Sequence, residues 1–294
     1  MALRSNPPAP DGLLAAGSRL GGARIERLLR RGAMGALYLA VQEPEGGPLA
    51  VKAVPLGTAG GAASAAAQQD FLNESAHAVR LRHPGIVTTY GALVHEGVGY
   101  VAMELLAGTD LGRYTQAGRL LPEALALEIG ARVAEALAYA HRQGVVHRDV
   151  KPTNVMFDLA SGGVKLTDFG IARTNDAEAT RSGLLLGSPI YMAPELLAGA
   201  RADAGSDLYA LGVTLFQLLT GHPPFEAASM GALLRAMASQ APQTVSALRT
   251  DLPAAQAGAL DAALAQVLTR SATERQRDGD AWAAGLRQLR QSVF

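Results

Sequence analysis

The chain has 294 residues and no formal net charge at pH 7, and 49% of its residues are hydrophobic. This length and composition favour one large domain or two lobes, and they exclude a largely disordered chain or one with a basic footprint for nucleic acid. Cysteine is absent, which excludes disulfides, thiol catalysis and cysteine-based zinc sites.

The first 17 residues, MALRSNPPAPDGLLAAG, are rich in proline and polar residues. Their apolar stretch is too short for a signal peptide, so we expect a flexible N-terminal tail. No apolar run in the sequence is long enough to cross a bilayer. We therefore expect a cytoplasmic protein, or the cytoplasmic domain of a longer membrane-anchored one, with no membrane span in this chain.

Residues 18–106 read as a small β-rich lobe. Short apolar or alternating runs, separated by turns with glycine or proline, predict strands at 23–31, 35–42, 48–55, 85–94 and 97–106. One helix is expected at about 65–81, ending before Pro84 because the residue that precedes a proline disfavours helical geometry.

Residues 107–294 read as a larger lobe that is mostly α-helical. Pro122 is expected at the first position of a long helix that closes at Gly144. The segment 207–221 is apolar all round, which is typical of a helix buried in the centre of a lobe. Further helices are expected at 230–239, 254–268 and 280–289. The fold class is therefore α+β, with two lobes.

The segment GVVHRDVKPTNVMFD, residues 144–158, sets five polar side chains between two apolar runs. Both runs, 144–146 and 155–157, resemble short core strands. Charged groups held in such a frame are costly unless they are paired or in use. This segment is therefore a candidate site.

Two weaker signals precede that segment in the chain. Gly32 and Gly35 lie in a turn between two strands and could let backbone amides approach a phosphate, although such a turn is more often only a hairpin. Lys52 lies in the middle of a strand, and on its own it is more often an exposed edge residue. Glu74 on the helix is a candidate partner for Lys52.

Stronger signals lie in HRDVKPTN and in VKLTDFGIAR. Asp149, Asn154 and Asp168 provide hard oxygen ligands of the kind that Mg²⁺ prefers when it also binds substrate phosphates. Lys151 lies two residues from Asp149, so on an extended backbone both side chains point the same way.

Taken together, these motifs resemble those of the protein kinase family, from about Leu20 to Leu289. The order is a glycine loop at 32–37, a strand lysine, a helix glutamate, a catalytic loop from His147 to Asn154, DFG at 168–170 and APE at 193–195. The motifs GAMGALYLA, HRDVKPTNVM, TDFGIAR and GSPIYMAPE resemble the bacterial Ser/Thr type most. The structural residues that this resemblance implies are His147, Phe169, Glu195, Asp207 and Arg275, with Arg275 expected to pair with Glu195.

The resemblance implies transfer of the ATP γ-phosphoryl group to a Ser or Thr hydroxyl, with Mg²⁺, or Mn²⁺ as an alternative, as cofactor. Lys52, oriented by Glu74, would hold the α- and β-phosphates, and Asn154 and Asp168 would bind the metal. Lys151 would neutralise the transferred group. Asp149 would orient the hydroxyl first and accept its proton late, because a free aspartate is a weak base for an alcohol.

The resemblance also implies a nucleotide-binding set. Adenine would lie between Leu29, Leu37 and Ala50 on one side and Met156 on the other, and the segment MELLAG would form the hinge. Core packing alone would also explain these apolar residues. The complete expected ATP-binding set is Leu29, Gly32, Gly35, Leu37, Ala50, Lys52, Met103, Glu104, Leu106, Asp110, Met156 and Asp168.

In this family, an arginine before the catalytic aspartate implies control by a segment that phosphorylation orders. That segment would be TNDAEATRSGLLLGSP, in which Thr180 and Ser182 are the expected phosphorylation sites. Arg148 and Arg173 would form the pocket that receives the phosphate. The alternative is an unmodified mobile loop.

Two positions depart from the family pattern. Arg30 stands where the glycine loop usually has its first glycine, which could cost about 1 kcal/mol if the position needs a glycine conformation. Ser188 stands where threonine is usual, and it keeps the hydroxyl. We expect at most a weaker affinity for ATP.

Two other functions remain open. A pseudokinase scaffold would usually lack an equivalent of Lys52, Asp149 or Asp168, and all three are present. A small-molecule kinase would lack the segment GSPIYMAPE, which implies protein substrates carrying Ser or Thr. No nucleic-acid partner is expected, and no sequence feature decides whether the chain forms a homodimer.

Overall fold

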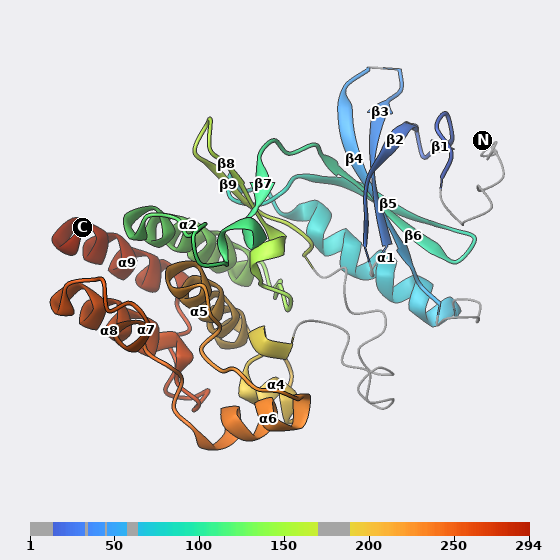
Figure 1. Ribbon diagram of the computed structural model, residues 1–294. Helices are drawn as coiled ribbons and strands as arrows, with labels where there is room; N and C mark the ends of the chain where they lie inside the picture. The colour runs from blue at the N-terminus through green and yellow to red at the C-terminus, as the bar shows by residue number, and fades with distance from the viewer. Residues whose placement is uncertain (1–13, 33–34, 45, 58–63, 170–188) are drawn as a thin grey trace. The chain divides into compact units, whose positions relative to one another are not determined.

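The computed structural model describes residues 14–32, 35–44, 46–57, 64–169 and 189–294 (Figure 1). The chain divides into two compact units. The first comprises the described parts of Met1–Arg82 together with Val87–Leu106. The second comprises His83–Ile86 and the described parts of Ala107–Ala172 and Gly183–Phe294.

The first unit is built on one antiparallel sheet of six strands, in the order β1-β2-β3-β4-β6-β5. Short connections join β1 to β2, β2 to β3, β3 to β4 and β5 to β6, which favours antiparallel pairing of these strands, whereas α1 and β5 lie between β4 and β6 in the chain. The strands are β1 (Arg19–Leu20), β2 (Ala23–Gly32), β3 (Gly35–Gln42), β4 (Pro48–Pro55), β5 (Thr89–His95) and β6 (Val98–Glu104).

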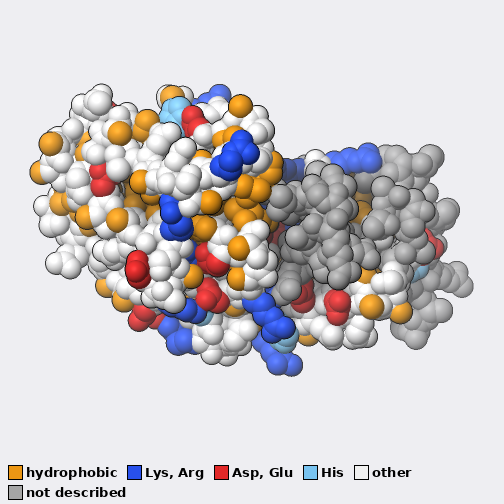
Figure 2. All heavy atoms as spheres, turned by 90° about the horizontal axis from the view of Figure 1, so that it is seen from below, with side chains coloured by type: hydrophobic (Ala, Val, Ile, Leu, Met, Phe, Trp, Pro, Cys, Tyr) orange, Lys and Arg blue, Asp and Glu red, His pale blue; other side chains and the backbone are white. Residues whose placement is uncertain are grey.

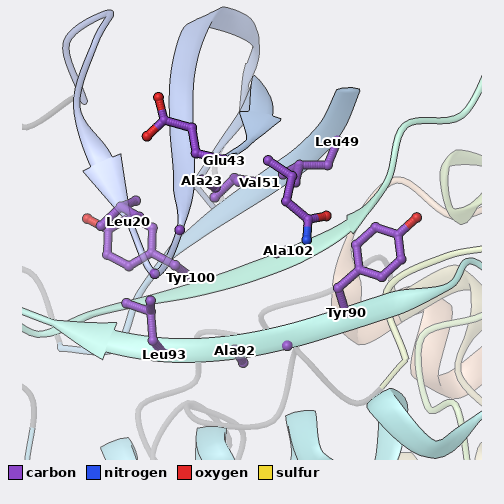
Figure 3. Close-up of a pocket in the computed structure, with 14 residues that line it drawn as sticks. Leu20, Ala23, Glu43, Leu49, Val51, Tyr90, Ala92, Leu93, Tyr100 and Ala102 are labelled. Atoms are coloured by element: carbon purple, nitrogen blue, oxygen red, sulfur yellow. The ribbon is translucent and has the colours of Figure 1, made fainter. Parts of the chain in front are cut away.

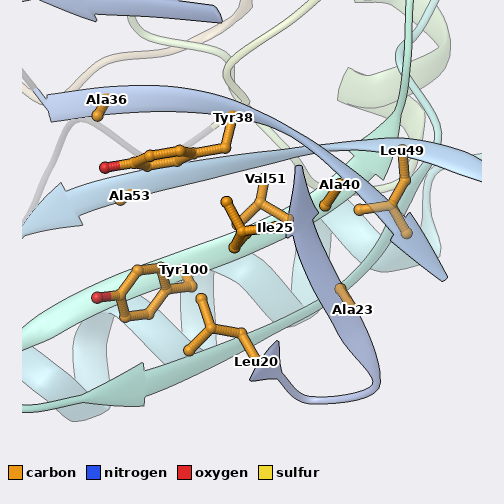
Figure 4. Packing of buried hydrophobic residues seen from close by; sticks show 10 residues of the cluster. All are labelled: Leu20, Ala23, Ile25, Ala36, Tyr38, Ala40, Leu49, Val51, Ala53 and Tyr100. Carbon is orange, nitrogen blue, oxygen red and sulfur yellow. The ribbon is translucent and has the colours of Figure 1, made fainter. Parts of the chain in front are cut away.

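The two faces of this sheet differ because side chains alternate along each strand. Tyr38 pairs with Val51 across β3 and β4, and Ala53 pairs with Tyr100 across β4 and β6, which puts all four side chains on one face. They belong to a buried apolar cluster (Figure 4). Lys52 pairs with Leu37 and therefore lies on the opposite face.

The segment before β1 is attached to the sheet. The backbone N–H of Leu14 donates to the hydroxyl of Tyr38 at 3.1 Å, and that of Gly17 donates to the carbonyl of Ile25 at 2.8 Å. The rest of the expected tail, residues 1–13, lies outside the described residues.

One helix, α1 (Ala65–Arg80), packs on β5 and β6 (Figure 1). Ser64 caps its first turn by accepting a hydrogen bond from the N–H of Ala67. The helix buries Phe71, which is 1% exposed and fits over Gly99, where a β-carbon would come within 2.5 Å of the ring. Burial of this ring contributes about 1.5–3 kcal/mol to the attachment of the helix.

The second unit is mainly helical. Its longest helices are α2 (Glu123–Arg142), α5 (Ala204–Thr220), α8 (Ala254–Leu268) and α9 (Gly279–Val293). Shorter helices are α4 (Pro194–Leu197), α6 (Met230–Ser239) and α7 (Val245–Leu248), with 3-10 turns η1 (Leu111–Tyr114), η2 (Pro152–Asn154) and η4 (Pro189–Tyr191). A small sheet contains β7 (Thr109–Asp110), β8 (Val155–Asp158) and β9 (Gly163–Leu166), in that order.

Helix α5 forms the core of the second unit, as its uniformly apolar sequence predicts. It begins with a capping box in which Asp203 and Ser206 satisfy each other's backbone N–H groups. It ends at Gly221, which adopts a left-handed conformation with φ of 79°. On the surface of this unit, Arg, Asp and Glu side chains are interspersed, in keeping with the zero net charge (Figure 2).

Most of the predicted elements are present, but some differ. The strand predicted at 144–146 is wrong: the N–H of Val145 instead closes helix α2 by donating to the carbonyl of Ala140 at 2.9 Å. Pro122 precedes α2 as its N-cap residue instead of occupying its first turn. The strand predicted from residue 85 begins at Thr89, although Ile86 forms an isolated bridge with Leu166. No helix among the described residues is both long and apolar enough to span a membrane.

Candidate active site

In the second unit, the carboxylate of Asp207 on α5 holds the start of the segment 147–154. Asp207 is 1% exposed and accepts backbone N–H groups from His147 and Arg148, each at 2.8 Å. A third bond, also 2.8 Å long, joins it to Nε2 of His141 at the end of α2. A buried carboxylate with three donors is satisfied, and in return it fixes the position of the loop.

The next residue in this arrangement is His147, which is 1% exposed. Its Nδ1 accepts the N–H of Asp149 at 3.2 Å, so its Nε2 must carry the proton that is donated to the carbonyl of Thr167 at 2.7 Å. Its ring meets the ring of Phe169 edge-on, with the centroids 4.5 Å apart. His147 therefore ties the segment that carries Asp149 to the segment that carries Asp168.

Asp149, Lys151 and Asn154 form one hydrogen-bonded cluster. Nζ of Lys151 lies 2.9 and 2.7 Å from the two carboxylate oxygens of Asp149. Nδ2 of Asn154 donates to the carboxylate of Asp149 at 2.9 Å and to its backbone carbonyl at 2.8 Å. A carboxylate has about four acceptor positions, so these three contacts leave about one position for a substrate hydroxyl.

Two residues of this region have backbone conformations that side chains usually avoid. Arg148 has φ of 71° and Asp168 has φ of 65°. Such left-handed residues other than glycine cost energy and concentrate at functional sites, where the surrounding contacts enforce them. Here the bonds from Asp207 and His147 flank both positions. The strain thus marks the same region as the polar cluster does.

The small sheet positions two further residues of the expected nucleotide set. Asp110 pairs with Met156 across β7 and β8, so their side chains share a face. The carboxylate of Asp110 also caps η1 by accepting the N–H of Gly112 at 3.0 Å. The N–H of Thr167 donates to the carbonyl of Asn154 at 2.8 Å, which links the end of β9 to η2.

A partly buried ion pair links Glu195 on α4 to Arg275. The side chain of Arg275 is fully buried, and its guanidinium donates to both carboxylate oxygens of Glu195. The same guanidinium lies over the ring of Tyr209, 4.9 Å from its centroid. Burial raises the pKa of Tyr209, which keeps its hydroxyl neutral beside this pair.

In the first unit, the expected phosphate and adenine residues share one face of the sheet. Leu37 pairs with Lys52, and Ala50 pairs with Met103, which places all four on the face opposite the apolar cluster. Glu74 lies on α1 and is half-buried. These positions suit the expected set, and their roles stay predictions.

The hinge residues differ in what their backbone can offer. The N–H of Glu104 already donates to the carbonyl of Thr88 at 2.9 Å, and its carboxylate accepts the N–H of Thr88 at 2.6 Å. This N–H group is therefore unavailable to adenine, which leaves the carbonyl of Glu104 in the expected set. Leu106 is half-buried.

The glycine loop contains one glycine that the sheet itself requires. Gly35 has φ of 131°, and a β-carbon there would lie 2.0 Å from the carbonyl oxygen of Ala53. At Gly32 a β-carbon would meet nothing within 4 Å. Leu29 is exposed and lies at a register shift between β2 and β3.

The backbone strain that a glycine conformation would impose on Arg30 is absent. Arg30 pairs with Leu37 in a strand, and it is not among the described residues with positive φ. The position therefore does not need a glycine conformation. The expected phosphorylation residues Thr180 and Ser182, together with Arg173 and Ser188, lie outside the described residues.

Comparison with known proteins decides the family. Residues 24–277 match the family model described as protein kinase domain, which covers most of the chain. The chain belongs to the protein kinase domain family. The cluster around Asp149 lies within the matched residues.

Several bacterial proteins are among the curated relatives of this kinase domain. The chain is 39% identical over 282 residues to the serine/threonine-protein kinase PknJ of Mycobacterium tuberculosis, a match that covers 93% of this chain and 47% of PknJ. It is 39% identical to PkaA of Streptomyces coelicolor, with 68% of this chain and 39% of PkaA covered. It is 34% identical to Pkn1 of Myxococcus xanthus, with 92% and 38% covered. The chain thus spans about half the length of PknJ, and less than half the length of PkaA and of Pkn1.

A solved structure has the same fold. The crystal structure of residues 1–466 of Rad53 in complex with AMP-PNP matches with a TM-score of 0.71 and 23% identity, covering 90% of this chain and 64% of that one. The predicted class, a β-rich lobe with one main helix followed by a mostly α-helical lobe, is confirmed.

Sequence reasoning missed several residues of the site. His141 and Thr167 were not singled out, although they bind Asp207 and His147. The left-handed conformations of Arg148 and Asp168 were also missed, because neither residue type signals them. A histidine six residues before another histidine, at the end of a predicted helix, was the available signal for His141.

Proposed function

We propose that this chain is an ATP-dependent protein kinase that phosphorylates Ser and Thr hydroxyls of proteins. The observation that carries the proposal is the carboxylate of Asp149, which Lys151 and Asn154 hold in place while about one acceptor position remains. The relatives named as serine/threonine-protein kinases support it.

The residues present fit a magnesium ion bound together with ATP. The amide nitrogen of Asn154 is spent on Asp149, which leaves its oxygen as the remaining polar atom on the other side of the amide. Asp168 supplies a carboxylate. Among the described residues no three His, Cys, Asp or Glu form a metal cage, but Mg²⁺ usually takes one or two protein ligands and completes its shell with phosphates and water.

Bound magnesium and ATP would supply the transferable phosphoryl group and neutralise its charge. Asp149 would orient the substrate hydroxyl and take up its proton late in the reaction. Lys151 would serve both Asp149 and the phosphoryl oxygens, because its ammonium has three donors and the carboxylate uses two contacts. Lys52, oriented by Glu74, would hold the α- and β-phosphates of the same nucleotide.

Adenine would contact Leu29, Leu37, Ala50, Met103 and Met156. The carbonyl of Glu104 and the backbone of Leu106 would bind its edge, and Asp110 would reach the ribose. Gly32 and Gly35 would let the loop approach the phosphates.

We also propose that phosphorylation controls this kinase. Thr180 or Ser182 would receive the phosphate by autophosphorylation, and Arg148 and Arg173 would bind it. Mass spectrometry of active protein should find phosphate on one of these two residues, and a double alanine variant should lose activity. Full activity of that variant would refute the control mechanism and leave the proposed reaction untouched.

The reaction itself is tested with γ-labelled ATP, Mg²⁺ and a generic basic protein. Label on Ser or Thr of that protein, or of the kinase domain itself, is the expected result. Label on a small molecule instead would indicate a small-molecule kinase. Binding of ATP with no transferred label would indicate a pseudokinase, an alternative that no described feature favours.

A further inference from the structure

A pocket of about 420 Å³ opens in the first unit, on the face of the sheet opposite Lys52 (Figure 3). Side chains of β2, β3 and β4 approach it from one side, and those of β5 from the other (Figure 3). It is separate from the residues proposed to bind ATP, because Val51 lines it while the next residue, Lys52, faces away.

The sheet curls far enough to enclose this space. The turn between β1 and β2 lies against β5 at the opposite edge of the sheet: a β-carbon on Gly21 would come within 2.8 Å of a methyl carbon of Leu93. Pockets at the mouths of curled or closed sheets are common places for small ligands.

Small residues on three strands leave the space open. Ala23 on β2, Gly91 and Ala92 on β5, and Ala102 on β6 all line the pocket. Larger side chains at Ala23, Gly91 and Ala102 would fill it, whereas Ala92 pairs with Val101 and its side chain lies on the other face of the sheet. The pocket therefore exists because small side chains leave this part of the unit unfilled.

The floor of the pocket is apolar and firmly packed. Leu20, Leu49 and Val51 are 6%, 4% and 2% exposed and belong to the apolar cluster of the sheet (Figure 4). Because this floor is part of the folded core, the pocket is largely preformed. An apolar ligand in the pocket would bury its apolar surface against these side chains.

The charges at the rim neutralise one another. The carboxylate of Glu43 lines the pocket and accepts hydrogen bonds from Arg19 and from Arg24, which also pairs with Glu26. Two arginines thus face two glutamates, and the rim has no net charge to attract an ion. A charged ligand would lose its hydration without gaining a partner.

Two tyrosines supply the aromatic and polar parts of the lining. Tyr90 stands on the edge strand with 52% of its surface exposed, so its ring is available for stacking. Burial raises the pKa of Tyr100, and nearby Tyr38 and Glu96 raise it further, so its hydroxyl stays protonated. The lining therefore offers an aromatic wall and neutral hydrogen-bonding groups.

We propose that this pocket binds an uncharged small molecule that is mostly apolar, contains an aromatic ring and has one hydrogen-bonding group. The volume lies within the range of small-molecule sites, about 300–1,000 Å³. A protein partner would need a larger contact, on the order of 800 Å² on each side. Binding here does not depend on the proposed phosphotransfer reaction.

The probe for the test is N-phenyl-1-naphthylamine, a neutral aromatic amine that fluoresces in apolar surroundings. It is titrated into the full chain with excess Mg²⁺ and ATP, so that the nucleotide site is not the one measured. We expect saturable binding of one probe per chain. Ala23→Phe and Ala102→Phe should each weaken it at least tenfold, and Ala76→Phe on the exposed side of α1 should leave it unchanged.

Tyr90→Ala provides a second variant that the fold should tolerate, since this side chain is half-exposed, and it should also weaken binding. The anionic analogue 8-anilino-1-naphthalenesulfonate, which adds one sulfonate to the same skeleton, should bind at least tenfold more weakly than the neutral probe. Equal binding of the two probes would overturn the ligand class. Binding that is absent, or unchanged in folded Ala23→Phe and in Tyr90→Ala, would overturn the site. So would sedimentation data showing that Ala23→Phe dissociates a dimer, because the face would then be an interface between copies.

Discussion

Replacement of Asp207 by asparagine tests the scaffold beneath the catalytic loop. In the native protein the two carboxylate oxygens accept three donors at 2.8 Å from His147, Arg148 and His141. Oδ2 accepts the bonds from His147 and His141, and Oδ1 accepts the bond from Arg148, so an asparagine with its oxygen at the Oδ2 position keeps two bonds and loses one. Its NH₂ group would then face the N–H of Arg148, which it cannot bond. The lost bond to a buried charged group is worth about 1.5–3 kcal/mol, and we expect the free energy of unfolding to fall by about this amount.

The single tryptophan allows the loss of stability to be measured in the second unit, which contains Asp207. Trp282 is 2% exposed on α9, so its fluorescence during urea unfolding reports the second unit. Asp280→Asn is the matched control: its carboxylate is 48% exposed, and its loss should cost less than about 1 kcal/mol. Amide hydrogen exchange at residues 147 and 148 should also accelerate in the Asp207 variant. If stability and exchange both match the control, these bonds do not hold the loop.

Three further variants address other parts of the structure. Arg275→Met should destabilise the second unit by about 3–5 kcal/mol, because it leaves the partly buried Glu195 unpaired. A double-mutant cycle with Glu195→Gln should show coupling above about 1 kcal/mol, and additive losses would contradict the pairing. Burial raises the pKa of Tyr191 from 10.0 to about 12, so its contribution to the free energy of unfolding is present below pH 10 and is lost as pH rises toward 12. Tyr191→Phe should therefore reduce the fall in the free energy of unfolding between pH 10 and pH 12. An equal fall in the variant and the unmodified protein would refute this prediction. Lys52→Met should lower turnover about 100-fold or more, while circular dichroism shows that the variant keeps its folded structure. Near-normal turnover would remove Lys52 from the phosphate role.

Much of the fold could be predicted from local patterns. The alternation in 35–42 and 48–55 predicted β3 and β4 to the residue, and the apolar run 207–221 predicted the buried helix α5. The strand expected at 144–146 failed because its apolar residues follow a helix end and bond back to it. The apolar pattern of only three residues cannot distinguish a strand from a segment that hydrogen-bonds back to the end of the preceding helix.

The site was predictable by residue type and order, but not in its supporting contacts. The sequence indicated Asp149, Lys151 and Asn154, because each has the chemistry that phosphoryl transfer needs. It did not indicate His141, whose bond to Asp207 joins positions 66 residues apart. Nor did it indicate that Arg30 would lie in an ordinary strand, since that outcome depends on pairing with β3.

Turnover of the Asp149→Asn variant tests most directly whether Asp149 orients the substrate hydroxyl and accepts its proton. The substitution keeps the size of the side chain and removes the charge that would orient the hydroxyl and accept its proton. We predict that transfer of labelled phosphate to a protein Ser or Thr falls at least 100-fold, while ATP binding measured by calorimetry persists. Turnover close to that of the unmodified protein, with binding intact, would contradict it.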